Sequence, residues 1–248
     1  MPSYLVTGAS RGIGLGIVTK LLQDPGNFVI AAVRNPESES IATLGNDHPK
    51  ARFAVVQLDY SDYASIGKAA AEVAHLLPAG LDYLISNAGV SFQESASFES
   101  IDLQVFEEEL RVNTVAPIEV VRQFLPLVRK GTAKKVVFVS SFNGSLEFAP
   151  TVATLTITYA ITKAGLNILA RKWAAVLYQE GITTVVLHPG WVETELGVTI
   201  KDWWAERNPD LKPITVQQSA EDTLKVIAEA KLEEKIKLYN HTGSVIPW

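Results

Sequence analysis

A tyrosine and a lysine four residues apart, Tyr159 and Lys163, are the pair in this sequence best suited to acid–base chemistry. The segment Ile157–Gln179 around them has recurrent apolar residues and few helix breakers, which predicts a helix. Residues four apart lie on one face of a helix, so the phenol and the ammonium would lie side by side. A nearby cation favours the phenolate, so we expect Lys163 to lower the pKa of Tyr159 from about 10. Such a tyrosine can exchange a proton near neutral pH.

A glycine-rich turn near the N-terminus has the layout of a phosphate-binding unit. The apolar run Ser3–Thr7 predicts a strand, and a helix-like apolar segment follows the turn and ends at Leu22. Glycines let the backbone approach a pyrophosphate, and a helix N-terminus supplies free N–H groups and positive potential. The glycine spacing departs from the G-x-G-x-x-G fingerprint. The candidate phosphate-binding residues are Gly8, Ser10, Arg11, Gly12, Ile13 and Gly14.

The same turn also fits a second class of enzyme. Residues 8–12 formally match the G-x-S-x-G nucleophile elbow of α/β-hydrolases, with Ser10 as nucleophile and His188 as a candidate base. The elbow would lie on the first strand, with no preceding strand to supply the usual second oxyanion-hole N–H. A hydrolase is therefore the less favoured alternative.

The second apolar run, Phe28–Val33, ends in a basic residue. At this place an acidic side chain accepts hydrogen bonds from the ribose 2′-OH of NAD. Here Arg34 and Asn35 follow the run, and no carboxylate appears before Glu37. Arg34 together with Arg11 can hold a 2′-phosphate through charge-assisted hydrogen bonds, which predicts NADPH as the coenzyme.

A chain of 248 residues with 47% hydrophobic residues can bury a large core and fits one domain, although its length would also allow two. Further strands are expected at Phe53–Leu58, Leu81–Ser86, Lys135–Val139, Thr183–Leu187 and Lys235–Tyr239. Further helices are expected at Asp62–Leu77, Ile101–Val128 and Val216–Ala230. The segment 194–213, which contains Trp203 and Trp204, is expected to form a lid or a short helix.

Polar residues follow several of these strands, at the sheet edge where α/β proteins bind ligands. Asp59 can cap a loop or accept a hydrogen bond from an adenine amino group. The small-residue turn at 87–89 can be merely tight or leave room for a flat ring or a ribose. In the long helix, Pro117 cannot donate to the carbonyl of Asn113, which predicts a kink and a water at the freed carbonyl.

The composition excludes several functions. A net charge of −5 and a pI of about 5.5 argue against nucleic acid or an anionic membrane surface as partners. The absence of cysteine excludes disulfides, thiolate metal sites and a cysteine nucleophile, and we expect no metal site. No apolar stretch approaches the roughly 18 residues of a membrane span, and the N-terminus lacks the basic region of a signal peptide. We expect a cytoplasmic protein.

Taken together, these motifs resemble the short-chain dehydrogenase/reductase family. The motifs that carry the resemblance are Thr7–Gly14, Asn87-Ala88-Gly89, Asn113, Ser141, Tyr159 with Lys163, and Pro189-Gly190. They occur in the order typical of the family and cover nearly the whole chain. The segment His188–Thr194 and the terminal Ile246-Pro247-Trp248 resemble the carbonyl-reductase-like branch, which includes ketoreductases of polyketide pathways.

The resemblance implies a Rossmann fold, a doubly wound parallel sheet of seven strands in the order 3-2-1-4-5-6-7 with helices on both faces. It implies that Tyr159 is the acid–base group and that Lys163 lowers its pKa and holds the nicotinamide ribose. It also implies that Ser141 binds the substrate carbonyl and that Asn113 holds the water of a proton relay. The residues implied in holding the rest of the cofactor are Val192 and Thr194 at the carboxamide, with Ile13, Asp59, Asn87, Ala88, Gly89, Pro189 and Gly190.

One feature departs from the family pattern. Ser141 and Tyr159 are 18 positions apart, a longer connection than is usual in the family. An insertion around Glu147–Leu155 is therefore expected to reshape the entrance for substrate. The longer connection also leaves open whether Ser140 or Ser141 is the active hydroxyl, and the motif favours Ser141.

The sequence therefore predicts an NADPH-dependent reductase of a ketone or aldehyde, with Tyr159 as the proton donor. Five aromatic residues suggest an apolar small-molecule substrate, although core packing would explain them equally well: Phe142, Phe148, Trp191, Trp203 and Trp204. An NADP-binding sensor on the same fold is the main alternative, although a sensor has no need of a proton relay. Apolar residues on more than one side of the Tyr159 helix predict a homodimer or homotetramer.

Overall fold

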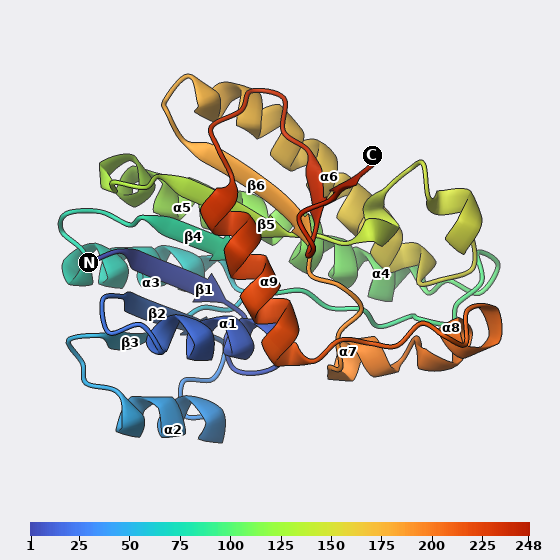
Figure 1. Cartoon of the computed structure of the whole chain (residues 1–248), viewed down its shortest axis with the longest axis horizontal. Coiled ribbons are helices and arrows are strands. Elements are labelled where there is room, and N and C mark those ends of the chain that lie inside the picture. Colours follow the sequence, from blue (N-terminus) through green and yellow to red (C-terminus); the bar gives the residue numbers. More distant parts are fainter.

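One sheet of eight strands forms the centre of the computed structural model, which describes residues 1–248 (Figure 1). The strands are β1 (Ser3–Thr7), β2 (Phe28–Val33), β3 (Phe53–Gln57), β4 (Tyr83–Ser86), β5 (Lys135–Val139), β6 (Thr183–His188), β7 (Leu238–Asn240) and β8 (Val245–Ile246). Their order is β3-β2-β1-β4-β5-β6-β7-β8, and the first seven run parallel. The predicted α/β class and the order of the seven parallel strands are confirmed.

The predicted number of strands is wrong by one. The strand β8 has only two residues and pairs antiparallel with β7. A tight turn fixes this pairing: Asn240 N–H donates to the Ser244 carbonyl at 2.7 Å, and Gly243 adopts φ +86°. A strand this short has no apolar periodicity, so its sequence pattern could not predict it.

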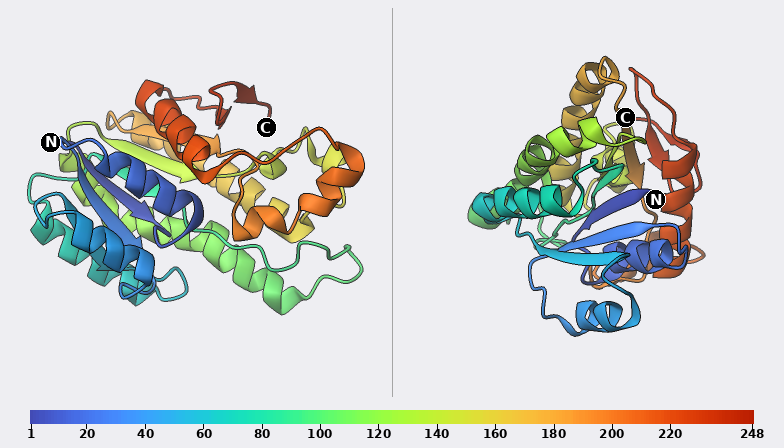
Figure 2. Two further views of the ribbon diagram at one scale, coloured as in Figure 1. Left: turned by 60° about the horizontal axis from the view of Figure 1, so that its bottom comes forward. Right: turned by 90° about the vertical axis from the view of Figure 1, so that its left-hand side faces the viewer.

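The parallel strands are covered on both faces, which explains their apolar composition. All six residues of β2 are buried. The helices on one face are α1 (Gly12–Leu22), α2 (Glu39–Asp47) and α9 (Val216–Glu229), and those on the other are α3 (Tyr63–Leu76), α5 (Ala116–Lys130) and α6 (Ile157–Tyr178). Figure 2 shows the two layers of helices on either side of the sheet. Shorter helices are α4 (Leu103–Leu110), α7 (Glu195–Val198) and α8 (Lys201–Arg207).

Close packing between α1 and α9 connects the two ends of the chain. A Cβ at Gly16 of α1 would lie only 2.6 Å from Cγ1 of Val216, so a larger residue would push α9 away. Lys20 of α1 pairs with Glu221 of α9 at 2.8 Å. The Ser219 hydroxyl of α9 donates to the Pro189 carbonyl at 2.7 Å and so holds the segment that follows β6.

The predicted long helix at 101–128 is two helices joined by a π-helical turn, Arg111–Val115. The turn lies where the sequence predicts a kink, because Asn113 and Pro117 interrupt the normal hydrogen-bond ladder there. The Ala116 N–H donates to the carbonyl of Arg111, five residues earlier. The wider turn changes which side chains face the sheet and places Asn113 in a fully buried position.

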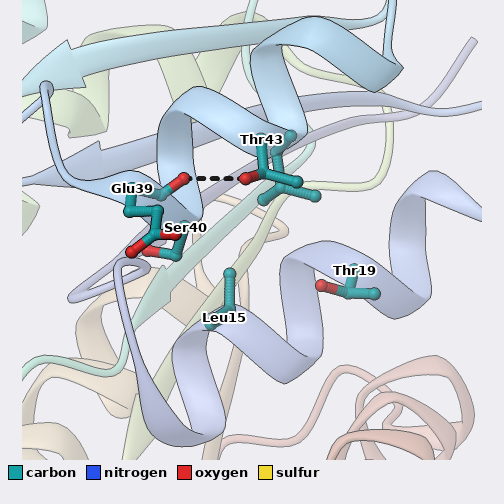
Figure 3. Close-up of a pocket in the computed structure, with 6 residues that line it drawn as sticks. Leu15, Thr19, Glu39, Ser40 and Thr43 are labelled. Carbon is teal, nitrogen blue, oxygen red and sulfur yellow. Dashed lines mark hydrogen bonds between the residues drawn. The ribbon is translucent and has the colours of Figure 1, made fainter.

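Helix α2 is not among the helices that the sequence predicts. It is short, contains glycine and asparagine, and buries only Ile41 and Leu44. A recess of about 430 Å³ lies between α1 and α2, lined by Leu15, Thr19, Glu39, Ser40, Thr43 and Leu44 (Figure 3). The recess lies on the opposite face of the sheet from α6, so it is separate from Tyr159 and Lys163.

The connection between Ser141 and Tyr159 contains two short 3₁₀ turns, Phe142–Gly144 and Ala149–Val152, of which the second lies in the predicted insertion around Glu147–Leu155. The C-terminal segment holds it in place. The Ser145 hydroxyl donates to the Pro247 carbonyl at 2.6 Å, and the Glu147 N–H donates to the Trp248 carbonyl at 3.2 Å.

None of the helices combines the length and the apolar composition that a membrane-spanning helix needs.

A buried hydroxyl network connects the core to the sheet edge where the motifs meet. Tyr60 contacts Thr7 Oγ1 at 2.8 Å and Ser86 Oγ at 2.9 Å through its own hydroxyl. Thr7 Oγ1 in turn accepts the N–H groups of Asn87 and Ala88. The network therefore fixes the turn after β4 relative to β1. Burial raises the pKa of Tyr60 to about 12, although hydrogen bonds to Ser86 and Thr7 lower it.

Tyr60→Phe is expected to lower the free energy of unfolding by about 1–2 kcal/mol at pH 7, because it leaves the buried Ser86 hydroxyl without its partner. Urea denaturation measures this difference, with the exposed Tyr63→Phe as control. Since the folded pKa of Tyr60 exceeds the unfolded value of about 10, its contribution is complete below pH 10 and is lost as pH rises through about 12. The gap between parent and variant should therefore narrow above pH 10. Equal stability at pH 7 would contradict the network.

Candidate active site

Tyr159 and Lys163 lie in the first two turns of α6, as the spacing predicts. The Lys163 ammonium lies 5.5 Å from the centroid of the Tyr159 ring. Lys163 is almost completely buried, and its Nζ donates to the carbonyl of Val139, the last residue of β5, at 2.9 Å. This bond fixes the ammonium at the carboxyl edge of the sheet.

The sequence predicts a lowered pKa for Tyr159, and the side chains of this site raise it instead. Burial raises the pKa of Tyr159 above its ordinary value, a hydrogen bond with Ser141 lowers it, and the negative charge of Glu109 raises it. Burial also lowers the pKa of Lys163 to about 8. The spacing of two residues reveals their adjacency but not the desolvation of the phenol, and desolvation is the larger effect here.

The two serines after β5 have different partners. The Ser140 hydroxyl donates to Asn167 Oδ1 at 2.5 Å and is therefore engaged with α6. Ser141 lies close enough to Tyr159 to lower its pKa, and Ser141 Oγ accepts the N–H of Asn143 at 3.2 Å. This arrangement agrees with the choice of Ser141 as the active hydroxyl.

Asn113 is held by three hydrogen bonds. Its Nδ2 donates to the Val90 carbonyl at 2.7 Å and to Thr162 Oγ1 at 3.0 Å, and its Oδ1 accepts the Val90 N–H at 2.8 Å. A Cβ at Gly89 would lie 3.2 Å from Asn113 Oδ1 and 3.4 Å from Lys163 Nζ. Asn113 and Lys163 therefore converge at Gly89, beside the turn that follows β4.

Two buried polar residues at this site, Thr162 and Asn167, were not identified from the sequence. Thr162 Oγ1 accepts a hydrogen bond from the Asn113 amide, and the Thr162 hydroxyl donates to the Tyr159 carbonyl at 2.7 Å. Asn167 Oδ1 accepts a hydrogen bond from the Ser140 hydroxyl, and the Asn167 amide donates to the Gly144 carbonyl at 3.0 Å. A polar residue four positions after Lys163 interrupts the buried face of the helix, and this pattern could have identified Asn167.

The glycine turn after β1 forms a cradle for an anion. Gly8 has φ +65°, and a Cβ there would lie 2.9 Å from Cα of Ala88, so the position requires glycine. The next helix, α1, begins after Arg11 without a side-chain cap and has no acidic residue in its first turn. Asp62, Asp102 and Thr215 do cap helices α3, α4 and α9. The uncapped N–H groups of α1 therefore suit a phosphate.

The two arginines predicted to hold one phosphate do not form a preformed pair. Arg34 is exposed directly after β2. Arg11 forms an ion pair with Glu195 of α7, and both side chains are exposed. Helix α2 contributes a contact that the sequence did not suggest: Ser40 Oγ donates to the Ser10 carbonyl at 2.6 Å and ties α2 to the glycine turn.

The predicted residues after β3 and β4 lie at the same sheet edge. Asp59 Oδ1 accepts the Ser61 N–H at 2.8 Å, so this carboxylate caps its own loop. Asn87 lies against the glycine turn, since its Nδ2 donates to the Thr7 carbonyl at 2.9 Å. Asn87 and its neighbour Ala88 therefore connect β1 and β4, the two adjacent strands between which the strand order reverses.

The segment after β6 reaches the glycine turn from the other side. Gly190 has φ +93°, and Val192 forms a single parallel bridge with Ile214. Thr194 caps α7 by accepting the Gly197 N–H at 3.1 Å. A Cβ at Gly12 would lie 3.3 Å from Cγ2 of Thr194, which shows how closely the two segments approach.

Aromatic side chains from three segments gather beside Ser141. The ring of Phe142 lies 5.2 Å from His188 and 6.0 Å from Trp204, measured between centroids. Trp204 of α8 also lies 6.1 Å from Trp191 and 5.0 Å from Trp203. We call Phe142, His188, Trp191, Trp203 and Trp204 the aromatic cluster. Phe148, the fifth aromatic residue taken to suggest an apolar substrate, is partly exposed and does not belong to the cluster.

Ser10 and His188 do not form a catalytic pair. Ser10 lies in the glycine turn after β1, His188 is the last residue of β6, and no hydrogen bond joins them. Burial lowers the pKa of His188 to about 3, with a further contribution from His241, and His188 Nδ1 has no hydrogen-bond partner. The geometry does not support the hydrolase alternative.

The chain matches the family described as short chain dehydrogenase over residues 3–205. It is 37% identical over 204 residues to the short-chain dehydrogenase/reductase atnB of an Arthrinium species, which covers 79% of this chain and 76% of that protein. NADPH-bound carbonyl reductase from chicken fatty liver has a TM-score of 0.88 and 32% identity, covering 100% of this chain and 99% of that chain. Carbonyl reductase Sniffer of D. melanogaster has a TM-score of 0.87 and 25% identity, covering 100% of both chains.

These similarities confirm the resemblance to the carbonyl-reductase-like branch. They extend over the glycine turn, the Asn113 turn and the α6 pair, so they include every segment that forms the site. The chain therefore belongs to the short-chain dehydrogenase/reductase family of oxidoreductases.

Proposed function

We propose that this protein is an NADPH-dependent carbonyl reductase that reduces a ketone or aldehyde to an alcohol, with Tyr159 as the proton donor. The observation that carries the proposal is the convergence of a half-buried Tyr159, whose raised pKa keeps its hydroxyl protonated, with Ser141 and Lys163. The 32% identity to an NADPH-bound carbonyl reductase over the whole chain supports it.

The cofactor would be held at the carboxyl edge of the sheet. The uncapped start of α1 suits its pyrophosphate, and Arg34 suits a 2′-phosphate. Bound NADPH supplies the hydride. The remaining candidate contacts are Ile13, Asp59, Asn87, Ala88, Gly89, Tyr159, Lys163, Pro189, Gly190, Val192 and Thr194. In this proposal residues 1–248 form one NADP-binding domain, and the segment 194–213 acts as its lid over the substrate.

The protein's own groups would carry out the proton chemistry. Ser141 holds the substrate carbonyl oxygen against the Tyr159 hydroxyl by hydrogen bonding. Tyr159 donates its proton as negative charge develops on that oxygen, and the Lys163 ammonium stabilises the phenolate that remains. Because its pKa is about 8, Lys163 also exchanges protons near neutral pH, and Asn113 would hold the water that connects it to solvent.

The aromatic cluster favours an apolar small-molecule substrate. Its rings come from the segments after β5 and β6 and from α8, so they would surround a molecule bound at Ser141. An NADP-binding sensor remains the second candidate function, and the complete Ser141, Tyr159, Lys163 and Asn113 set argues against it. A screen of carbonyl compounds for NADPH oxidation separates the two.

Tyr159→Phe removes only the ionisable hydroxyl and keeps the ring, so NADPH affinity should persist while turnover falls by at least about 10²- to 10⁴-fold. Stopped-flow binding and steady-state rates measure the two effects separately. Ser10→Ala is the matched control. In a reductase it should lower the affinity for NADPH only slightly, whereas in a hydrolase that uses Ser10 as nucleophile it should abolish activity. Parental turnover by Tyr159→Phe would refute the mechanism.

Arg34→Asp should weaken NADPH binding by about 10- to 100-fold and leave NADH binding nearly unchanged, because it places a negative charge against the 2′-phosphate. Fluorescence titration with both coenzymes measures the ratio. Lys172→Asp makes the same change of charge at an exposed position on α6 and should alter neither affinity. Equal affinities of the parent for NADPH and NADH would exclude the proposed preference.

Helix α6 exposes apolar side chains that a second copy of the chain would cover. Ile161, Ile168 and Val176 are 47%, 58% and 62% exposed. We therefore expect a homodimer or homotetramer at micromolar concentration, with Ile168→Asp shifting it towards monomer. Sedimentation or light scattering measures the mass, and a monomeric parent would contradict the expectation.

A further inference from the structure

The residue that precedes α6 has an unusual backbone conformation. Thr156 is buried and lies in the left-handed region, with φ +44° and ψ +56°. This region is unfavourable for a β-branched residue and suits glycine or asparagine better. The Thr156 side chain does not cap the helix, so a threonine at this strained position needs another reason.

The Thr156 hydroxyl oxygen accepts a hydrogen bond from Asn143 Nδ2 at 2.9 Å. Asn143 lies two residues after Ser141 and is only 7% exposed. Its own N–H donates to Ser141 Oγ at 3.2 Å. Asn143 therefore contacts both ends of the long connection, Ser141 itself and the residue three positions before Tyr159.

The turn that carries Asn143 is fixed against the middle of α6. A Cβ at Gly144 would lie 2.7 Å from the carbonyl carbon of Lys163, so the turn and the helix are in direct contact. Asn167 Nδ2 donates to the Gly144 carbonyl at 3.0 Å. The Asn143 side chain thus extends from an anchored turn to the start of the same helix.

The start of α6 has few other anchors. The first N–H groups of a helix have no partner within it, and helix ends fray. Lys163 is held at the Val139 carbonyl. At residues 155–158, by contrast, the hydrogen bond from Asn143 is the only one that involves a side chain. Tyr159 is the third residue of α6 and lies next to this weakly anchored end.

We propose that Asn143 is a positioning residue for the reduction. Through Thr156 it holds the first turn of α6, and with it the Tyr159 hydroxyl, in place relative to Ser141. Ser141 and Tyr159 are 18 positions apart, and a connection of that length does not fix their distance by itself. A displacement of about 1 Å at a reacting group can lower a rate by about 10²-fold. The inference rests on the proposed reductase function.

Asn143→Ala should lower kcat for the reduction of benzaldehyde by about 10- to 100-fold and leave the dissociation constant of NADPH nearly unchanged. In a Tyr159→Phe background the same substitution should cost less than about 3-fold, because no hydroxyl remains to be positioned. Equal losses in the two backgrounds would overturn the inference, since Asn143 would then act on another part of the site. Asn46→Ala changes an exposed asparagine of α2 and should match the parent.

Variants of Thr156 test the hydrogen bond from its other side. Thr156→Val removes the acceptor oxygen but keeps the shape of the side chain, so it should reproduce the loss caused by Asn143→Ala. Thr156→Ser keeps the oxygen and should restore most of that rate. Equal rates for these two Thr156 variants would contradict the proposal. Thermal unfolding establishes that each variant is folded at the assay temperature.

Hydrogen exchange supplies a readout that does not depend on turnover. The Ala160 N–H donates to the Thr156 carbonyl at 2.9 Å. Asn143→Ala should speed exchange of this amide by about 10-fold or more and leave the second half of α6 as in the parent. Unchanged exchange at Ala160, or faster exchange along the whole helix, would overturn the inference. If the parent reduced no carbonyl compound, the reductase proposal would fail, and exchange would still decide whether Asn143 anchors this turn.

Discussion

The buried ammonium of Lys163 imposes the constraint on which the rest of the site depends. A cation removed from water needs acceptors, and the main chain provides one in the carbonyl of Val139, at the end of β5. Burial lowers the pKa of this lysine to about 8, so its charge responds to every neighbour that approaches it. Gly89 has no side chain, which leaves room for the ammonium and the Asn113 amide at the same turn. The end of β5, the π-helical turn and the first turns of α6 must therefore meet at one place.

The sheet makes that convergence possible because parallel strands present their carboxyl ends together. Thr7 and Tyr60 fix the turn after β4 against β1 through buried hydroxyl contacts. On the other side, Thr194 brings the segment after β6 to the glycine turn. Backbone turns that hydrogen bonds hold in place thus line this edge of the sheet. Arg34 lies exposed directly after β2, where we propose that its charge selects between the coenzymes.

Strands and helices with a repeating sequence pattern could be predicted, and contacts between distant elements could not. Six of the seven parallel strands are apolar runs because both of their faces are buried, and Tyr159 with Lys163 follows from helical spacing alone. Helix α2 and strand β8 depend on turns and tertiary packing, so their short sequences carry little signal. The ion pair of Arg11 with Glu195 joins residues 184 positions apart and has no local pattern.

The Tyr159 pKa likewise could not be predicted from a local sequence pattern. Its direction follows from burial, a property of the whole fold, rather than from the lysine four residues away. Glu109 could not be identified as relevant for the same reason, since three consecutive glutamates at 107–109 resemble a solvated helix face. Only the fold shows that two of them are exposed and the third is completely buried.

Burial and the Glu109 charge act on Tyr159 in the same direction, and both favour the protonated phenol. A protonated tyrosine is the form that a carbonyl reduction consumes, whereas oxidation of an alcohol requires the phenolate. The Ser141 hydrogen bond acts in the opposite direction and becomes more important as negative charge develops beside it. In the proposed mechanism, the protein groups hold the proton on Tyr159 before reaction, and Ser141 and Lys163 stabilise the phenolate that its loss leaves. This balance suits the direction in which the site would donate a proton.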